Sequence, residues 1–302
     1  MAHPRRVVAG ETYLLTRRCY QRTFRLRPCA ETNGIFLYCL AFAAQRTGVV
    51  IHAACVMSNH HHLVVTDTCG VLPEFLRELH RLTAKAINAS QGQWENLWAA
   101  EPCNAVRLVT EADVEDKIAY VVANPVAAGL VEQPEQWPGV LLWGDRSVRV
   151  PRPEVYFRES GTCPPELELR IQRPAPMDGG ACSTVEWRSR LSRAVAERVL
   201  SAHRTLREAG RTFLGRAAVL ASSFVQRARA YEERFGVVPT FAAKLRAVRE
   251  ALRRVARSFR RQYRRAFERW RRGERDVAFP VGTWGMVVVH GAVVCAAAPF
   301  TE

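Results

Sequence analysis

Polar and apolar positions follow two different periods along the first 130 residues, and these periods predict strands and helices. The segments with alternation or β-branched content, which is typical of strands, are 12–18, 49–57, 60–66 and 104–109. Apolar residues at helical spacing predict helices over 31–45 and 72–89. Thr110 comes before an acidic turn and therefore predicts the start of a third helix. Pro125 should kink or end that helix.

This order of elements predicts an α+β fold in which helices pack on a face of one sheet, over residues 1–150. Proline and glycine pairs between positions 164 and 180 indicate a linker, which we place at 151–182. We expect residues 183–302 to form an arginine-rich helical region that ends in a hydrophobic segment. The valine-rich part of that segment, 287–294, is expected to fold back as a strand or a buried hairpin.

The composition of the 302 residues narrows the class of protein. No apolar run is long enough to cross a bilayer, and the amino terminus does not read as a signal peptide, so we expect a cytoplasmic protein without a membrane partner. Nine cysteines lack any Cys-x-x-Cys pair, which argues against a disulfide scaffold and against a structural zinc site.

The basic charge is concentrated in the second half of the chain. The net charge is +15 in total and the isoelectric point is near 10.0, but residues 1–150 contribute only +1 of it. Most of the excess lies in 241–272, where an apolar stripe at helical spacing is flanked by arginines. Such a helix binds a phosphate backbone or an anionic membrane, and we favour DNA. The arginines chosen as DNA contacts are Arg253, Arg257, Arg260, Arg261 and Arg264.

Two pairs of residues carry the candidate chemistry. His60 and His62 lie two positions apart in a predicted strand, so they share a face and can offer two imidazoles to one metal ion. Tyr120 and Asn124 lie four positions apart in a predicted helix and also share a face. Together these four residues can form a metal-assisted tyrosine nucleophile. His61 should point to the opposite face.

A second candidate nucleic-acid contact follows the first predicted strand. Arg17, Arg18 and Arg22 flank Tyr20 and Phe24 there. Arginines beside aromatic rings suit single-stranded DNA, because the guanidinium groups hold phosphates while the rings stack on bases. A solvated loop is an equally good interpretation of the same residues.

The strings Met57-Ser58-Asn59-His60-His61-His62-Leu63 and Tyr120-Val121-Val122-Ala123-Asn124-Pro125-Val126 resemble motifs of the single-tyrosine HUH transposases, in the REP-associated tyrosine transposase branch. The resemblance covers about 13–130. It implies a ferredoxin-like or RRM-like antiparallel sheet. It also implies that His60, His62 and Asn124 bind a divalent metal, Mg²⁺ or Mn²⁺, and that Tyr120 attacks single-stranded hairpin or palindromic DNA to leave a 5′-phosphotyrosine link.

Several positions depart from the family pattern. Ser58 stands where a proline is usual, Val122 where a histidine is common, and Ala127 where an arginine is common; the stretch 97–101 lacks the usual Gly-Arg-aromatic string. The sequence thus predicts a metal-dependent DNA strand transferase. The alternative is a DNA-binding regulator on the same scaffold that no longer cleaves. A homodimer with Tyr120 acting in trans is left open, as is the DNA sequence recognised.

Overall fold

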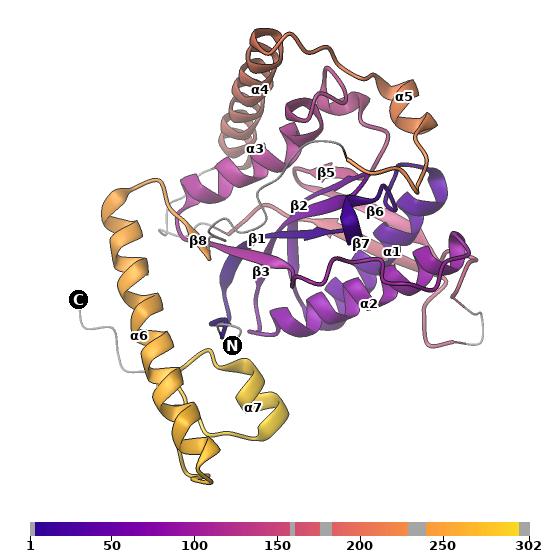
Figure 1. The fold of residues 1–302 in the computed structure, drawn as a ribbon. Coiled ribbons are helices and arrows are strands. Elements are labelled where there is room, and N and C mark those ends of the chain that lie inside the picture. Colours follow the sequence, from indigo (N-terminus) through magenta and orange to yellow (C-terminus); the bar gives the residue numbers. More distant parts are fainter. Residues whose placement is uncertain (1–3, 158–160, 176–182, 229–239, 296–302) are drawn as a thin grey trace.

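The computed structural model describes residues 4–157, 161–175, 183–228 and 240–295, which form an α+β fold around one mixed sheet (Figure 1). The strands are β1 (Glu11–Arg18), β2 (Val50–Met57), β3 (His60–Asp67), β4 (Asn104–Leu108), β5 (Leu141–Trp143), β6 (Arg146–Pro151), β7 (Glu166–Ile171) and β8 (Phe241–Ala242). The helices are α1 (Ala30–Thr47), α2 (Leu72–Ser90), α3 (Glu111–Ala127), α4 (Thr184–Glu208), α5 (Arg216–Ala221), α6 (Arg246–Arg271) and α7 (Trp284–His290), with 3-10 turns η1 (Tyr20–Arg22) and η2 (Pro134–Gln136).

The centre of the sheet is antiparallel, as the sequence predicts. Strands β2 and β3 form a hairpin across Ser58 and Asn59, and β1 lies between β3 and β4. The expected strands and the first two helices agree with the structure to within two residues at each end. Two parallel contacts, β2 with β7 and β4 with β8, widen the sheet with strands from beyond residue 150.

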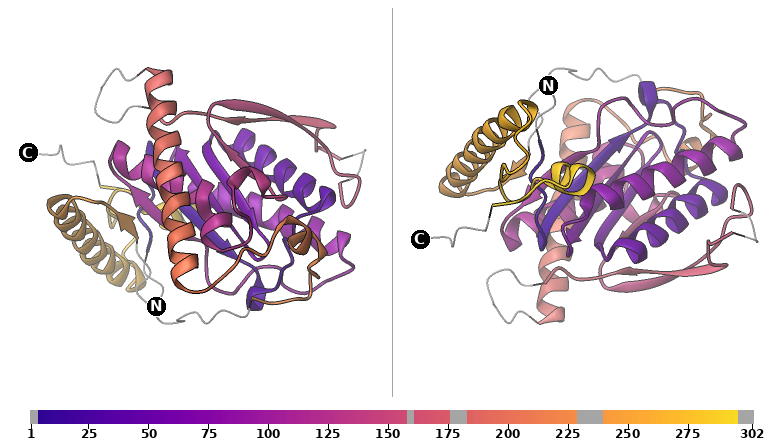
Figure 2. Two further views of the ribbon diagram at one scale, coloured as in Figure 1. Left: turned by 90° about the horizontal axis from the view of Figure 1, so that it is seen from above. Right: turned by 90° about the horizontal axis from the view of Figure 1, so that it is seen from below.

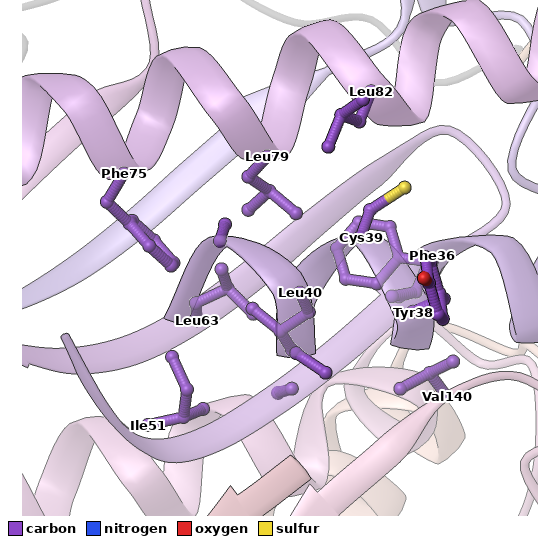
Figure 3. Packing of buried hydrophobic residues seen from close by; sticks show 14 of the residues in the cluster. Phe36, Tyr38, Cys39, Leu40, Ile51, Leu63, Phe75, Leu79, Leu82 and Val140 are labelled. Carbon is purple, nitrogen blue, oxygen red and sulfur yellow. The ribbon is translucent and has the colours of Figure 1, made fainter. Parts of the chain in front are cut away.

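Side chains of the central strands point alternately to the two faces of the sheet, and both faces are buried. Leu63 packs with Phe36, Leu40 and Phe75 of α1 and α2 (Figure 3). Leu15 of β1 belongs to the same apolar cluster. The alternate positions face α3 and form a second apolar cluster. Because helices cover both faces, β2 and β3 are buried at nearly every position rather than at every second one.

Helix α4 completes the layer that covers the second face. It lies against α3, on the side away from the sheet (Figure 2, left). Its buried residues Leu191, Val195 and Val199 belong to the same apolar cluster as Ile118 and Val122 of α3. The division of the chain at residue 150 stays a prediction, while α4, β7 and β8 all join the sheet or its helical layers.

Helix α6 extends along the edge of the sheet and packs on α7 (Figure 1). Phe279, Met286 and Ala292 are buried against Ala266 of α6. The expectation of a strand over 287–294 is wrong for its first part, because α7 runs from Trp284 to His290. A local run of apolar residues is compatible with either element, and here the apolar face of α6 provides the surface against which a helix packs. Within the described ranges no helix is long and apolar enough to cross a membrane.

The buried carboxylate of Asp67, at the end of β3, binds the backbone at the start of α2. Its side chain is fully buried and accepts hydrogen bonds from the backbone N–H groups of Val71 at 2.9 Å and Leu72 at 2.8 Å. These are donors that a helix leaves without a partner in its first turn.

We expect Asp67→Ala to lower the free energy of unfolding by about 1–3 kcal/mol, because two buried N–H groups lose their acceptor. Asp67→Asn keeps one carbonyl oxygen and should lose less. Urea denaturation of the two variants tests this. A loss below ~0.5 kcal/mol in the alanine variant, within the usual range for surface substitutions, would contradict the capping role.

Candidate functional site

The structure brings together the four residues that the sequence singles out. Strand β3 places His60 and His62 on the face that α3 covers, and their ring centroids lie 4.7 Å apart with the planes at 88°. The ring of Tyr120 lies over His62, with the two centroids 5.4 Å apart and the planes at 79°. We call His60, His62, Tyr120 and Asn124 the histidine–tyrosine site.

Helix α3 sets the position of Tyr120. The Thr110 hydroxyl accepts a hydrogen bond from the N–H of Asp113 at 3.1 Å and caps the helix, as predicted. Pro125 does not break the helix at once, since α3 continues to Ala127. Asn124 lies one turn beyond Tyr120 on the same face of the helix, and its side chain acts to lower the pKa of the phenol.

The phenol of Tyr120 is half-buried, and its pKa reflects opposing influences. Burial raises the pKa of Tyr120 above its usual range. The side chain of Asn124 and the positive charges of Arg198 and Arg18 act in the opposite direction, since each favours the phenolate. These cations therefore oppose the cost of ionising a tyrosine in this position.

The two histidines have the features of metal ligands. The Thr16 hydroxyl lies 2.9 Å from Nδ1 of His62, and Oδ1 of Asn59 lies 2.6 Å from Nδ1 of His60. Metal-binding histidines are commonly oriented through the ring nitrogen that does not bind the ion, so Nε2 is the nitrogen that remains for a metal here. Burial, with smaller contributions from Arg18 and Arg22, lowers the pKa of His60 to about 4. The neutral form is the one that binds metals.

The donor set fits a divalent ion. Two imidazole nitrogens and the carboxamide oxygen of Asn124 would give three protein ligands, which leaves coordination positions open for a substrate. Nitrogen and oxygen donors of this kind suit Mn²⁺ or Mg²⁺. In the described part of the chain no group of three or more His, Cys, Asp and Glu residues could hold a metal ion.

His61 lies on the opposite face, as expected from strand alternation. It is fully buried, its Nε2 lies 3.0 Å from Nε2 of His80, and its ring contacts Trp98. Arg17 is on this face too, in register with His61, and its guanidinium lies 5.9 Å from the centre of the Trp98 ring. The structure therefore does not bring Arg17 to the histidine–tyrosine site.

Arg18 and Arg22 lie on the side of the site. Arg18 is exposed and pairs in register with His60 across β1 and β3. Arg22 has a left-handed backbone with φ at 58°, which is uncommon for a residue with a side chain. Its carbonyl accepts hydrogen bonds from the Asn59 side chain at 3.4 Å and from the N–H of Ala228 at 3.3 Å. These contacts hold the loop beside His60.

Three residues near the site were missed from the sequence. Thr16 holds His62, while Lys117 and Arg198 each place a cation 5.8 Å from the centre of the Tyr120 ring. Helical spacing could have suggested Lys117, which lies one turn before Tyr120. Nothing in the sequence marks Arg198, because α4 carries arginines at many positions.

The arginines predicted to contact DNA on α6 lie away from this site, on the helix at the edge of the sheet (Figure 1). Arg253, Arg257, Arg261 and Arg264 are exposed, and Arg260 is half-buried. Within the described residues none of these five has an ion pair. Glu250 on α6 pairs with Arg246, and Glu274, just after the helix, pairs with Arg269 and Arg272.

Comparison with solved structures finds partial likeness. The chain is similar to a REP-associated tyrosine transposase bound to a REP hairpin, with 19% identity and a TM-score of 0.40 over 46% of this chain and 81% of that one. It is also similar to a candidate transposase from Deinococcus radiodurans R1, with 20% identity and a TM-score of 0.28 over 41% of this chain and 97% of that one. No family model and no curated protein matches the chain.

Proposed function

We propose that this chain is a single-strand DNA transesterase of the transposase type, with Tyr120 as the nucleophile. The observation that carries the proposal is the position of the Tyr120 ring over His62, with His60 beside it. A phenol is a weak nucleophile at neutral pH, so it needs neighbouring groups that favour its ionised form. Asn124, Arg18 and Arg198 supply that support.

The reaction conserves the phosphodiester bond. The Tyr120 oxygen forms a bond to phosphorus while the bond from phosphorus to the 3′ oxygen breaks. The phenol gives up its proton and the leaving 3′ oxygen gains one, so the products are a 5′-phosphotyrosine and a free 3′-hydroxyl. No nucleotide hydrolysis is required, because one phosphodiester replaces another.

His60, His62 and Asn124 would hold the divalent ion. The chemistry that such an ion supplies is polarisation of the phosphoryl oxygens and neutralisation of the charge that develops there. The protein contributes the orientation of the two imidazoles through Thr16 and Asn59. It also holds the phenol against the same face, through the packing of α3 on the sheet.

The arginines of α6 would bind the DNA backbone outside the reacting phosphate. A basic surface runs along this helix, which is about 39 Å long at the usual rise per residue. It consists of the exposed Arg253, Arg257, Arg261 and Arg264 and the half-buried Arg260. Contacts of this kind neutralise phosphates without reading sequence. Arg18 and Arg22 would contact the strand nearer to His60.

We expect Tyr120→Phe to abolish the covalent adduct with DNA, a loss of about 10⁴-fold or more in rate, because no other group replaces the nucleophile. The measurement incubates the protein with labelled hairpin-containing single-stranded DNA and Mn²⁺, and it detects complexes that resist denaturation. Tyr156→Phe, at an exposed tyrosine on another loop, should form the adduct as the wild type does. DNA binding by the wild type without any adduct would instead favour the non-cleaving regulator.

We expect variants of the proposed metal site to lose Mn²⁺ affinity to different extents. The affinity is measured by calorimetry in the Tyr120→Phe protein, so that no reaction interferes. His62→Ala should remove detectable binding. Thr16→Val, which deletes only the hydroxyl that orients His62, should weaken binding by about 10–100-fold. His203→Ala, on α4, should bind Mn²⁺ unchanged. Equal Mn²⁺ affinity of the Tyr120→Phe protein with and without His62→Ala would rule out this ligand set.

Replacing the five α6 arginines, Arg253, Arg257, Arg260, Arg261 and Arg264, with glutamine should reduce the salt dependence of DNA binding. Each lost phosphate contact to a single strand lowers the slope of log K against log salt by about 0.7. Arg246→Gln is the control, because Arg246 is paired with Glu250 at 2.8 Å. A slope equal to that of the wild type would show that α6 does not contact the backbone.

A further inference from the structure

The carboxylate of Asp116, beside Tyr120, forms ion pairs with three cationic side chains. Oδ1 of Asp116 lies 2.7 Å from Nη2 of Arg198 and 3.2 Å from Nζ of Lys244, and Oδ2 lies 3.0 Å from Nζ of Lys117. The cations come from α3, from α4 and from the segment that leads into α6. We call Asp116, Lys117, Arg198 and Lys244 the Asp116 cluster.

The cluster has an excess of positive charge. Burial alone would raise the pKa of Asp116, but hydrogen bonds from Lys117 and Arg198 outweigh it and lower that pKa to about 2. Asp116 is therefore ionised at neutral pH. The next carboxylate, Asp113, is buried and accepts a hydrogen bond from the backbone N–H of Lys244 at 3.0 Å. Three cations thus face two carboxylates, and one positive charge stays uncompensated. Such an excess attracts an anion.

A second ion-pair group between α3 and α4 has the opposite balance of charge. Arg190 of α4 lies 2.6 Å from Glu115 and 4.0 Å from Glu111, so one cation there meets two carboxylates. That arrangement satisfies its own charge and joins the helices. The Asp116 cluster also joins α3 to α4, but it holds more positive charge than this task requires.

The excess charge lies next to the nucleophile and is accessible. Lys117 and Arg198 are each 5.8 Å from the centre of the Tyr120 ring, and their side chains keep 26% and 34% of their exposure. Lys244 is more open, at 61%. Arginine and lysine that retain unused donors are the side chains that bind phosphate oxygens.

We propose that the Asp116 cluster is a phosphate-binding subsite that holds the backbone of the nucleic-acid strand beside Tyr120. The inference rests on the proposed function, since it assigns the cations to the strand that Tyr120 attacks. The histidines and Asn124 play no part in this subsite. Lys244 lies two residues before α6, so the subsite adjoins the start of the arginine-rich helix.

The test measures binding of a short oligo-dT strand to Tyr120→Phe protein as a function of salt, so that no reaction interferes. Adding Arg198→Gln should weaken binding roughly 10-fold, since a hydrogen-bonded charge contact to phosphate is lost. It should also lower the salt slope by about 0.7. Arg198→Lys keeps the charge and should keep the slope. The matched control, Arg190→Gln, breaks an α3–α4 ion pair elsewhere and should leave both quantities unchanged.

Asp116→Asn gives a test with the opposite sign. Removing the carboxylate raises the excess charge, so the subsite predicts tighter binding of oligo-dT, whereas mere disruption of helix packing would weaken it. Weaker binding in Asp116→Asn, or an unchanged slope in Arg198→Gln, would overturn the subsite. Adduct formation by the wild type separates this failure from that of the proposed function. Absence of both the adduct and any oligo-dT binding would overturn both.

Discussion

The packing of α3 on the sheet is the interaction on which the site depends. Ile118 and Val122 of α3 are buried against Val64 of β3, the strand position that follows His62 on the same face. The apolar contacts that hold the helix therefore also set the height of Tyr120 above His62. Side chains in a close-packed interior leave little freedom for such a helix to shift. Loss of packing below the site would for this reason separate the phenol from the imidazoles.

The same packing buries His62, so its ring nitrogens need hydrogen-bond partners. His62 is almost completely buried, and burial lowers its pKa well below the usual value, so its charged form is excluded at neutral pH. A buried polar group costs free energy unless it is hydrogen-bonded, and Thr16 supplies a partner for one ring nitrogen. The apolar face thus keeps the imidazole neutral, while a single hydroxyl from β1 fixes how the ring is turned. Thr16 can do so because β1 and β3 pair in register at these two residues.

Local periodicity was enough to predict that His60 and His62 share one face and that Tyr120 and Asn124 share another, whereas the expectation that the two pairs meet came from the resemblance to the transposase motifs. A period of two determines the face of a strand and a step of four determines the face of a helix, so each pair of residues could be placed from neighbouring positions alone. Pairings between distant segments leave no such signal. Strand β7 joins β2 through Ile51 and Ile171, and α4 brings Arg198 to α3 from beyond a proline-rich segment. The helix α7 was missed for the same reason, because the surface that it covers belongs to α6.

Charge balance, rather than arginine content, separates the functional candidates from the structural ones. Arg190 is an arginine of α4 like Arg198, yet its two carboxylate partners leave it no unbalanced charge. The arginines along the outer face of α6 and the cations around Asp116 have too few carboxylates to match them. Like charges held close together repel, and this cost is recovered when a polyanion binds. The protein therefore retains this repulsion in two places, on α6 and beside Tyr120, and the proposed function brings a DNA strand to both.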